Sequence, residues 1–353
     1  MFYLSGQKLL VGDNPYLKYG QDIVRNPPTA LLFFVPLALF TVQFSQSLWF
    51  TFSFIAFLVG SYYLFKIISL GSNNKINFVS LKFWELYLTL VFLFFPFRYN
   101  LGSGQINNFL FLTLVLSFYY FVKKQSFKTG VFLALGIILK ITPLFFFYVL
   151  VIQRKFRILI YLITSLALLL ILPVLFFGIK IYNQFFSIGG SFVEFSNATY
   201  YNQSFTGFLS RTFHSTQLTF WVTILTLFLS LLLIFKINSS SKKDFFSLTL
   251  IWNISILSML IFAPFAWQYH FVIAIFPLTM TSYLACRFKS SYLFYLLIFI
   301  SYLGMGWNFK SPESLITLGV LGSVLLSHTF WGSFLLLVLN YFLVFKMKPG
   351  EIN

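Results

Sequence analysis

Long apolar runs follow one another along almost the whole chain and are separated by short polar or basic turns. Runs such as 47–64, 158–177 and 290–302 are long enough, with their flanks, to cross a bilayer as helices, which takes about 20 residues. Their apolar residues are continuous, whereas strands of a membrane barrel would alternate. The predicted membrane segments are 29–46, 48–66, 84–98, 108–122, 129–152, 158–178, 216–235, 245–263, 270–286, 290–306 and 314–346, the last long enough for two helices.

The composition strengthens this interpretation. Of 353 residues, 59% are apolar and 9% are charged, and the mean hydropathy is +0.88. Soluble domains carry about 25% charged residues, so this chain cannot cover a water-facing surface. We predict an all-α, polytopic integral membrane protein with about 10–12 transmembrane or re-entrant helices. Neither a repeat nor a linker is evident, so we expect a single transmembrane domain over residues 1–353.

The formal net charge of +17 comes from basic clusters between the apolar runs. Such clusters are typical of cytoplasmic loops, which makes nucleic acid an improbable partner. This orientation, in a plasma or inner membrane, predicts that loop 99–107, the large loop 179–215 and turn 264–270 are extracytoplasmic. The same orientation leads to one conflict along the chain, because it places residues 1–27 in the cytoplasm if segment 29–42 spans the membrane. Either segment 29–46, with its prolines, is kinked or re-entrant, or one cluster departs from the charge rule.

Segment 129–152 carries Lys128 before it and Arg154 after it, so both ends should be cytoplasmic. From Lys128 to Lys140 a helix rises about 18 Å, which is too short to cross, and Pro143 then breaks or kinks it. We expect two short helices with Lys140 at their apex, lining an internal cavity. A lysine at this depth costs about 2.5–3.5 kcal/mol, which an anionic ligand would offset. The alternative is a lysine that snorkels to an interface.

A polar cluster follows Arg98 at a predicted helix boundary. Gly102 and Gly104 permit a tight turn there. Gln105 and Asn107 supply donors and acceptors that suit sugar hydroxyls. An ordinary polar loop before the next helix would have the same composition, so both interpretations stay open.

Two more clusters lie in predicted extracytoplasmic loops. Arg211 follows Asn202 and Gln203 and could bind a phosphate through two parallel hydrogen bonds, although a solvated arginine is an equal alternative. Trp267 and His270 lie in an aromatic turn that suits a sugar face or a phosphate, and that also suits an interfacial aromatic belt, which is the more common case. The three histidines have no metal-ligand spacing, so the sequence indicates neither a divalent metal nor another cofactor.

Taken in order, these motifs resemble the polyprenol-phosphate-sugar-dependent glycosyltransferases of the GT-C superfamily, and among them glycosyltransferase family 87, which is α-1,2-mannosyltransferase-like. Individually each motif is modest, and the ordered set, which covers nearly the whole chain, carries the resemblance. The segments are Gly12-Asp13-Asn14-Pro15-Tyr16, Asn26-Pro27-Pro28, Gly104-Gln105-Ile106-Asn107, Thr129-Gly130, Leu139-Lys140-Ile141-Thr142-Pro143, Asn202-Gln203-Ser204 with Gly207 and Arg211, and Pro264 to His270.

The resemblance implies a hexosyltransferase of the cell envelope. It would move a hexose, mannose by family analogy, from a polyprenyl-phosphate-sugar donor to a glycan or glycolipid acceptor on the extracytoplasmic face. Donor-phosphate contacts are expected from Lys140, Arg211, Arg98 and His270, and sugar-binding or structural roles from Gln105, Asn107, Asn202, Gln203 and Trp267. A polysaccharide polymerase or ligase and a lipid-linked glycan transporter are the alternative functions.

The chain departs from the family pattern at its N-terminus. Family members have a transmembrane helix before the first external loop and an aspartate early in that loop, thought to be the general base. Here Met1 lies where that stretch should be ending, so residues 1–28 would be only part of the loop. The resemblance implies that the first helix and its aspartate are missing, and a chain that lacks this aspartate could be inactive. Asp13 and Asp22 are weak alternatives for the catalytic carboxylate.

Overall fold

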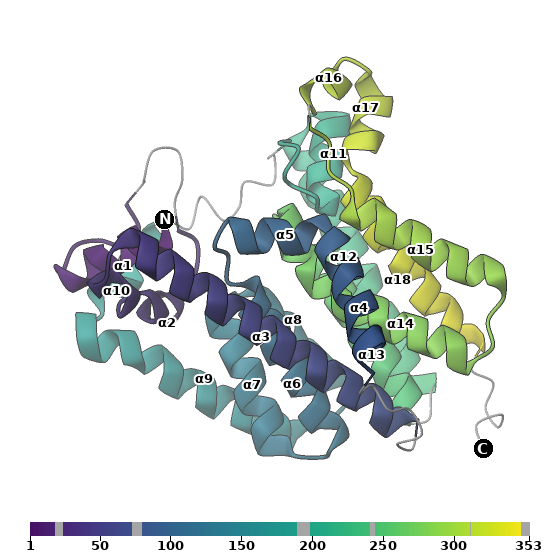
Figure 1. The fold of residues 1–353 in the computed structure, drawn as a ribbon, viewed down its shortest axis with the longest axis horizontal. Coiled ribbons are helices and arrows are strands. Elements are labelled where there is room, and N and C mark those ends of the chain that lie inside the picture. The colour runs from purple at the N-terminus through teal and green to yellow at the C-terminus, as the bar shows by residue number, and fades with distance from the viewer. Residues whose placement is uncertain (18–23, 73–79, 189–197, 241–243, 311, 347–353) are drawn as a thin grey trace. The chain divides into compact units, whose positions relative to one another are not determined.

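The computed structural model describes residues 1–17, 24–72, 80–188, 198–240, 244–310 and 312–346. Helices form most of this backbone, and the one bridged pair outside them in the described ranges joins Asn202 to Trp267 (Figure 1). Contacts between Cα atoms divide the chain into two compact units. Unit 1 comprises residues 1–63 and 104–193, and unit 2 comprises residues 64–103 and 194–353.

Within the described ranges, four helices are long and apolar enough to cross a membrane: Val42–Gly71, Phe156–Phe177, Gln217–Lys236 and Gln268–Arg287. The pair Gly319–Leu326 and His328–Val344 is bent by 64° and would make a fifth span if it acts as one. Shorter apolar helices cover 107–122, 126–139, 142–152, 245–261 and 292–306. The prediction of an all-α polytopic membrane protein is confirmed.

Unit 1 is built around α7, which packs against α6 on one side and α9 on another. Gly130 of α7 lets α9 approach closely, because a Cβ atom there would lie 2.7 Å from both the Leu162 nitrogen and the Tyr161 Cβ. The elements of this unit are α1 (Phe2–Leu10), α2 (Pro28–Leu31), η1 (Leu32–Phe34), η2 (Leu37–Leu39), the first part of α3 (Val42–Gly71), α6 (Asn107–Val122), α7 (Ser126–Leu139), η3 (Thr142–Leu144), α8 (Phe145–Ile152), α9 (Phe156–Phe177) and α10 (Lys180–Ser187).

The predicted membrane segment 29–46 is not one helix. It consists of α2, η1 and η2, and α3 begins only at Val42. Pro36 supplies no N–H and cannot continue a helical ladder from the preceding turn. The structure therefore agrees with the kinked alternative for this segment and corrects its assignment as a spanning helix.

Unit 2 contains a buried polar cluster among its apolar helices. Asn253 of α13 donates to Asn340 of α18 at 3.0 Å, and Asn340 donates to Thr281 of α14 at 2.9 Å. Such bonds hold helices together where no water is available. The elements are α4 (Leu81–Leu93), α5 (Phe95–Gly102), α11 (Phe205–Phe213), α12 (Thr216–Ser240), α13 (Phe245–Ile261), η5 (Gln268–Ala274), α14 (Ile275–Arg287), α15 (Tyr292–Gly306), α16 (Glu313–Ile316), α17 (Gly319–Leu326) and α18 (His328–Lys346).

Candidate functional site

The Lys140 turn in unit 1 has the local structure that the sequence predicts. Helix α7 ends at Leu139, Lys140 is extended with φ −157° and ψ 136°, and Pro143 lies in η3 before α8 begins. The prediction of two short helices joined at Lys140 is confirmed.

The Lys140 side chain contacts a second residue that the sequence predicted separately. Its Nζ donates a hydrogen bond to Asn107 Oδ1 at 3.2 Å, in partly buried surroundings. Asn107 is itself fully buried and is the first residue of α6. The fold thus brings together a candidate phosphate ligand and a candidate sugar or structural residue that lie 33 positions apart.

Asn26 stabilises the same turn, and the sequence indicated its motif but not its role. Its Nδ2 donates to the Leu139 carbonyl at 2.8 Å. In a continuous helix that carbonyl would accept from residue 143, but Pro143 has no N–H to give. Tyr16 completes the arrangement, because its hydroxyl donates to the Asn26 carbonyl at 3.0 Å. The N-terminal Asn-Pro motifs are therefore part of the support of Lys140.

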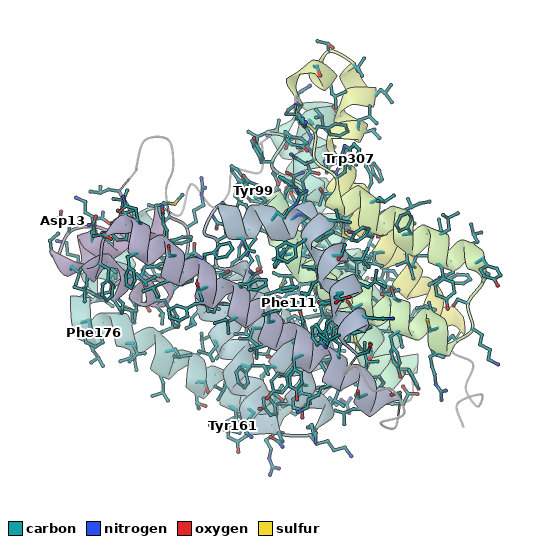
Figure 2. The ribbon with its side chains drawn as sticks, in the orientation of Figure 1. Asp13, Tyr99, Phe111, Tyr161, Phe176 and Trp307 are labelled. Carbon is teal, nitrogen blue, oxygen red and sulfur yellow. The ribbon has the colours of Figure 1, made fainter. Side chains whose placement is uncertain are left out.

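Of the two candidate acids, the structure describes only Asp13. Asp13 is exposed and forms an ion pair with Lys8, with Nζ and Oδ2 2.9 Å apart (Figure 2). Asp22 lies outside the described residues.

Gln105 is partly buried in the turn before α6. Its neighbour Gly104 has φ +64°, a conformation that favours glycine in the predicted tight turn.

In unit 2, segments 199–204 and 264–268 are joined by main-chain and side-chain hydrogen bonds. Gln203 donates its backbone N–H to the Ala266 carbonyl at 2.7 Å. Asn202 Oδ1 accepts from the Ala266 N–H at 3.1 Å and from the Ser204 hydroxyl at 2.8 Å. The two motifs are therefore one structural element, and the buried Asn202 amide has a structural role in it.

The Gln203 side chain satisfies backbone groups at the bend between α17 and α18. Its Nε2 donates to the Leu326 carbonyl at 2.7 Å, and its Oε1 accepts from the Thr329 N–H at 3.2 Å. A helix end leaves such groups without intrahelical partners. Of the two roles that the sequence allowed for Gln203, these contacts support the structural one.

Arg211 is buried, with 7% of its surface exposed. Its Nη1 donates to the carbonyls of Thr199 and Asn202 at 2.7 and 2.8 Å, and its Nη2 donates to Ser327 Oγ at 2.8 Å. Burial lowers the pKa of the guanidinium to about 10, so it stays charged at neutral pH. The alternative of a solvated surface arginine is wrong. Most of the guanidinium N–H groups that could bind a phosphate therefore donate to groups within the protein.

Gly207 allows α11 to lie against the Asn202 segment. A Cβ at this position would overlap the Asn202 carbonyl oxygen and approach its Cγ to 2.8 Å. We expect Gly207→Ala to lower the free energy of unfolding by about 1–3 kcal/mol, the usual cost of overpacking. Thermal unfolding in detergent measures this. Gly102→Ala is a matched control, because nothing lies within 4 Å of a Cβ there; equal losses would contradict the steric explanation.

The 264–270 turn presents an aromatic cluster. Trp267 stacks on Tyr201 with ring centroids 5.3 Å apart, and Tyr201 is partly exposed. The Trp267 Nε1–H has no hydrogen-bond acceptor among the residues placed by the structure. His270 is buried beneath the edge of Tyr269. Arg98, which also belongs to unit 2, is exposed and lies 5.9 Å from the Phe95 ring centroid.

His328, at the bend between α17 and α18, belongs to a network that the sequence did not reveal. Its Nδ1 lies 2.7 Å from the Gly304 carbonyl, and its Nε2 lies 3.0 Å from the Tyr200 hydroxyl. The carbonyl can only accept, so Nδ1 carries the proton and Nε2 accepts. Burial raises the pKa of the Tyr200 phenol, which stays neutral. The feature of the sequence that pointed to this site was the length of segment 314–346, which is long enough for two helices and therefore allows a bend between them.

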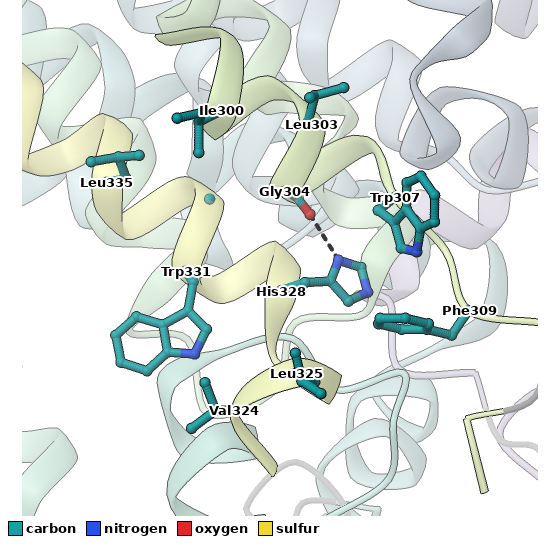
Figure 3. Close-up of a pocket in the computed structure, with 11 residues that line it drawn as sticks. Ile300, Leu303, Gly304, Trp307, Phe309, Val324, Leu325, His328, Trp331 and Leu335 are labelled. Atoms are coloured by element: carbon teal, nitrogen blue, oxygen red, sulfur yellow. Dashed lines mark hydrogen bonds between the residues drawn. The ribbon is translucent and has the colours of Figure 1, made fainter. Parts of the chain in front are cut away.

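His328 also lines a cavity of about 590 Å³ (Figure 3). The walls are formed by the end of α15, the segment after it, α17 and α18. The lining residues are Ile300, Leu303, Gly304, Trp307, Phe309, Val324, Leu325, His328, Trp331, Gly332 and Leu335. Nearly all of these side chains are apolar, so the cavity suits a hydrocarbon better than a polar ligand.

Comparison with known proteins identifies the family. The family model described as glycosyltransferase family 87 matches residues 25–264, which include Asn26, Lys140 and Arg211. No curated protein and no solved structure matches the chain significantly. The matched region is well over half of the chain, and the structure has the apolar helices of an integral membrane protein. The chain therefore belongs to glycosyltransferase family 87 and is a membrane glycosyltransferase.

Proposed function

We propose that this glycosyltransferase transfers a hexose, mannose in the first instance, from a polyprenyl-phosphate-sugar donor to a hydroxyl of a glycan or glycolipid. The reaction takes place on the extracytoplasmic face of the plasma or inner membrane. The acceptor oxygen bonds to the anomeric carbon while the bond from that carbon to the phosphate oxygen breaks. The electron pair leaves with the phosphate, and the acceptor proton passes to a carboxylate.

The observation that carries this proposal is the position of Lys140. An extended residue between two short apolar helices places a cation where the backbone is not helical, which is tolerated at membrane depth only if the backbone is buried in protein or lines a water-filled cavity. Its hydrogen bond to the buried Asn107 fixes the direction of the ammonium group. A preorganised cation of this kind stabilises the negative charge that develops on a departing phosphate.

Two features of unit 2 support a substrate that is both a sugar and a lipid. The Trp267 and Tyr201 stack offers an aromatic face for a sugar ring. The apolar cavity beside His328 suits a hydrocarbon chain. The proton acceptor stays unassigned; of the two weak candidates, Asp13 would have to exchange its ion pair with Lys8 for the acceptor hydroxyl.

The test is a transfer assay on membranes that contain the chain, with radiolabelled polyprenyl-phosphate-mannose, polyprenyl-phosphate-glucose and a nucleotide sugar as separate donors. We expect label to move from a polyprenyl-phosphate donor to a glycan or glycolipid, and none from the nucleotide sugar. Transfer of a preassembled oligosaccharide would support a polymerase or ligase. Movement of labelled lipid between leaflets without a new glycosidic bond would support a transporter and exclude the proposal.

A further inference from the structure

Among the residues that the structure describes, three helices end with a basic residue in a left-handed backbone conformation. Lys124, Arg154 and Lys289 have φ values of 57°, 53° and 46°. Each residue lies just after the last turn of its helix, in a Schellman motif, where two backbone hydrogen bonds close the helix end. After α6, for example, the Gln125 N–H donates to the Tyr120 carbonyl, and the Lys124 N–H donates to the Phe121 carbonyl. Glycine is the usual residue there because a Cβ atom is unfavourable. A benefit specific to the basic side chains would explain their presence.

Two of these helix ends lie together in unit 1. The turn after α6 covers residues 122–125 and the turn after α8 covers residues 152–157. Lys155 Nζ lies 5.4 Å from the centroid of the Phe121 ring, which joins the two turns directly. The ammonium groups of Lys123 and Lys128 likewise lie over the rings of Tyr119 and Tyr120, at 5.9 and 4.9 Å. Aromatic rings therefore form the base of one continuous basic surface.

This surface has a large excess of positive charge. Its exposed cations are Lys123, Lys124, Lys128, Arg154 and Arg157, and the sequence from 104 to 188 contains neither aspartate nor glutamate. Like charges brought together destabilise a fold unless an anion neutralises them. The ends of apolar helices with interfacial tyrosines lie at the level of lipid head groups. The phosphates of those head groups are therefore the anions that this surface would meet.

Gln153 gives a second, independent indication of a ligand. It lies in the same turn as Arg154, and only 3% of its surface is exposed. Within the described part of the chain, neither its Nε2 nor its Oε1 has a hydrogen-bond partner. A buried amide left in this state is costly. Both of its polar atoms lie beneath the surface, so its NH2 group could donate to a phosphate oxygen once the side chain rotates outward.

We propose that turns 122–125 and 152–157 form a binding site for the phosphate of an anionic phospholipid such as phosphatidylglycerol. The bound head group offsets both the left-handed conformation of Lys124 and Arg154 and the mutual repulsion of the basic side chains. This site is separate from the Lys140 turn and does not depend on which sugar donor the enzyme uses.

The test compares thermal unfolding in nanodiscs of pure phosphatidylcholine with unfolding in nanodiscs that also contain phosphatidylglycerol. We expect phosphatidylglycerol to raise the unfolding midpoint of the wild type. The Lys124→Gly and Arg154→Gly double variant should lose most of this increase, yet melt above the wild type in pure phosphatidylcholine because its helix ends are no longer strained. His214→Gly is the matched control: His214 has φ 51° outside the basic surface, so its effect should be the same in both membranes.

A double variant that keeps the full lipid-dependent increase, or a wild type that is equally stable in both membranes, would overturn the proposal. Inorganic phosphate added to phosphatidylcholine nanodiscs separates the two sources of phosphate. If it reproduces the increase, the surface is a site for free anions and the lipid assignment is wrong. Should the double variant not fold, Lys124→Asn alone removes one charge with a residue that tolerates the left-handed conformation, and the same comparison applies.

Discussion

Replacing Lys140 with glutamine is expected to reduce the turnover number of sugar transfer by about 100- to 1,000-fold, the usual effect of removing a preorganised group that stabilises transition-state charge. Glutamine can still donate a hydrogen bond to Asn107 Oδ1, so the turn and the helices on either side of it should keep their structure. Transfer from a purified lipid-phosphate sugar, measured at equal protein levels, gives the result.

Lys180→Gln is the matched control, because Lys180 is an exposed lysine of the same unit at the start of α10. It should transfer sugar at the wild-type rate. The unfolding midpoint of Lys140→Gln should equal or exceed that of the wild type, since a charge has been removed from partly buried surroundings. Full activity of Lys140→Gln would remove the phosphate role and leave the proposed function without its main support.

Arg211→Ala is expected to lower the free energy of unfolding by about 2–4 kcal/mol. The substitution removes three charge-assisted hydrogen bonds and leaves the partly buried carbonyl of Thr199 and the buried carbonyl of Asn202 without these donors. It also releases the Ser327 hydroxyl next to the bend between α17 and α18. Thermal unfolding in detergent, followed by size-exclusion chromatography, measures the loss.

The same experiment separates a structural role from phosphate binding. If Arg211 served only as a phosphate ligand, Arg211→Ala would lose transfer without losing stability. Arg211→Lys should also be unstable, because one ammonium group cannot reproduce the fork of donors that reaches two carbonyls and a hydroxyl. Arg98→Ala is the control, since Arg98 is exposed in the same unit and should change stability by less than about 0.5 kcal/mol.

The Lys140 turn could be predicted from the sequence because its determinants are local. The distance from Lys128 is too short for a spanning helix, and Pro143 stops α7 wherever the rest of the chain lies. The apolar helices were predictable for a similar reason, because their length and continuity follow from the thickness of a bilayer.

The partners of each motif could not be predicted in this way. Nothing in the sequence near Asn26 indicates that it binds a carbonyl 113 positions away. From the sequence alone, Gln203 could equally be an amide that binds sugar. Its hydrogen bonds to the backbone of Leu326 and Thr329 show that it satisfies polar groups at the bend between α17 and α18. Arg211 looked equally like a phosphate ligand or a surface residue, and it is a buried structural donor.

By itself, the sequence determined that this protein lies in a membrane, that its elements are helical, and that one of them breaks at Lys140. These properties depend on local hydrophobicity and on backbone chemistry that each segment carries with it. The tertiary structure decided which polar groups satisfy one another, because in an apolar environment every donor and acceptor needs a partner and the partner is chosen by packing. For that reason Asn107 lies beside Lys140, and Arg211 holds the Asn202 segment.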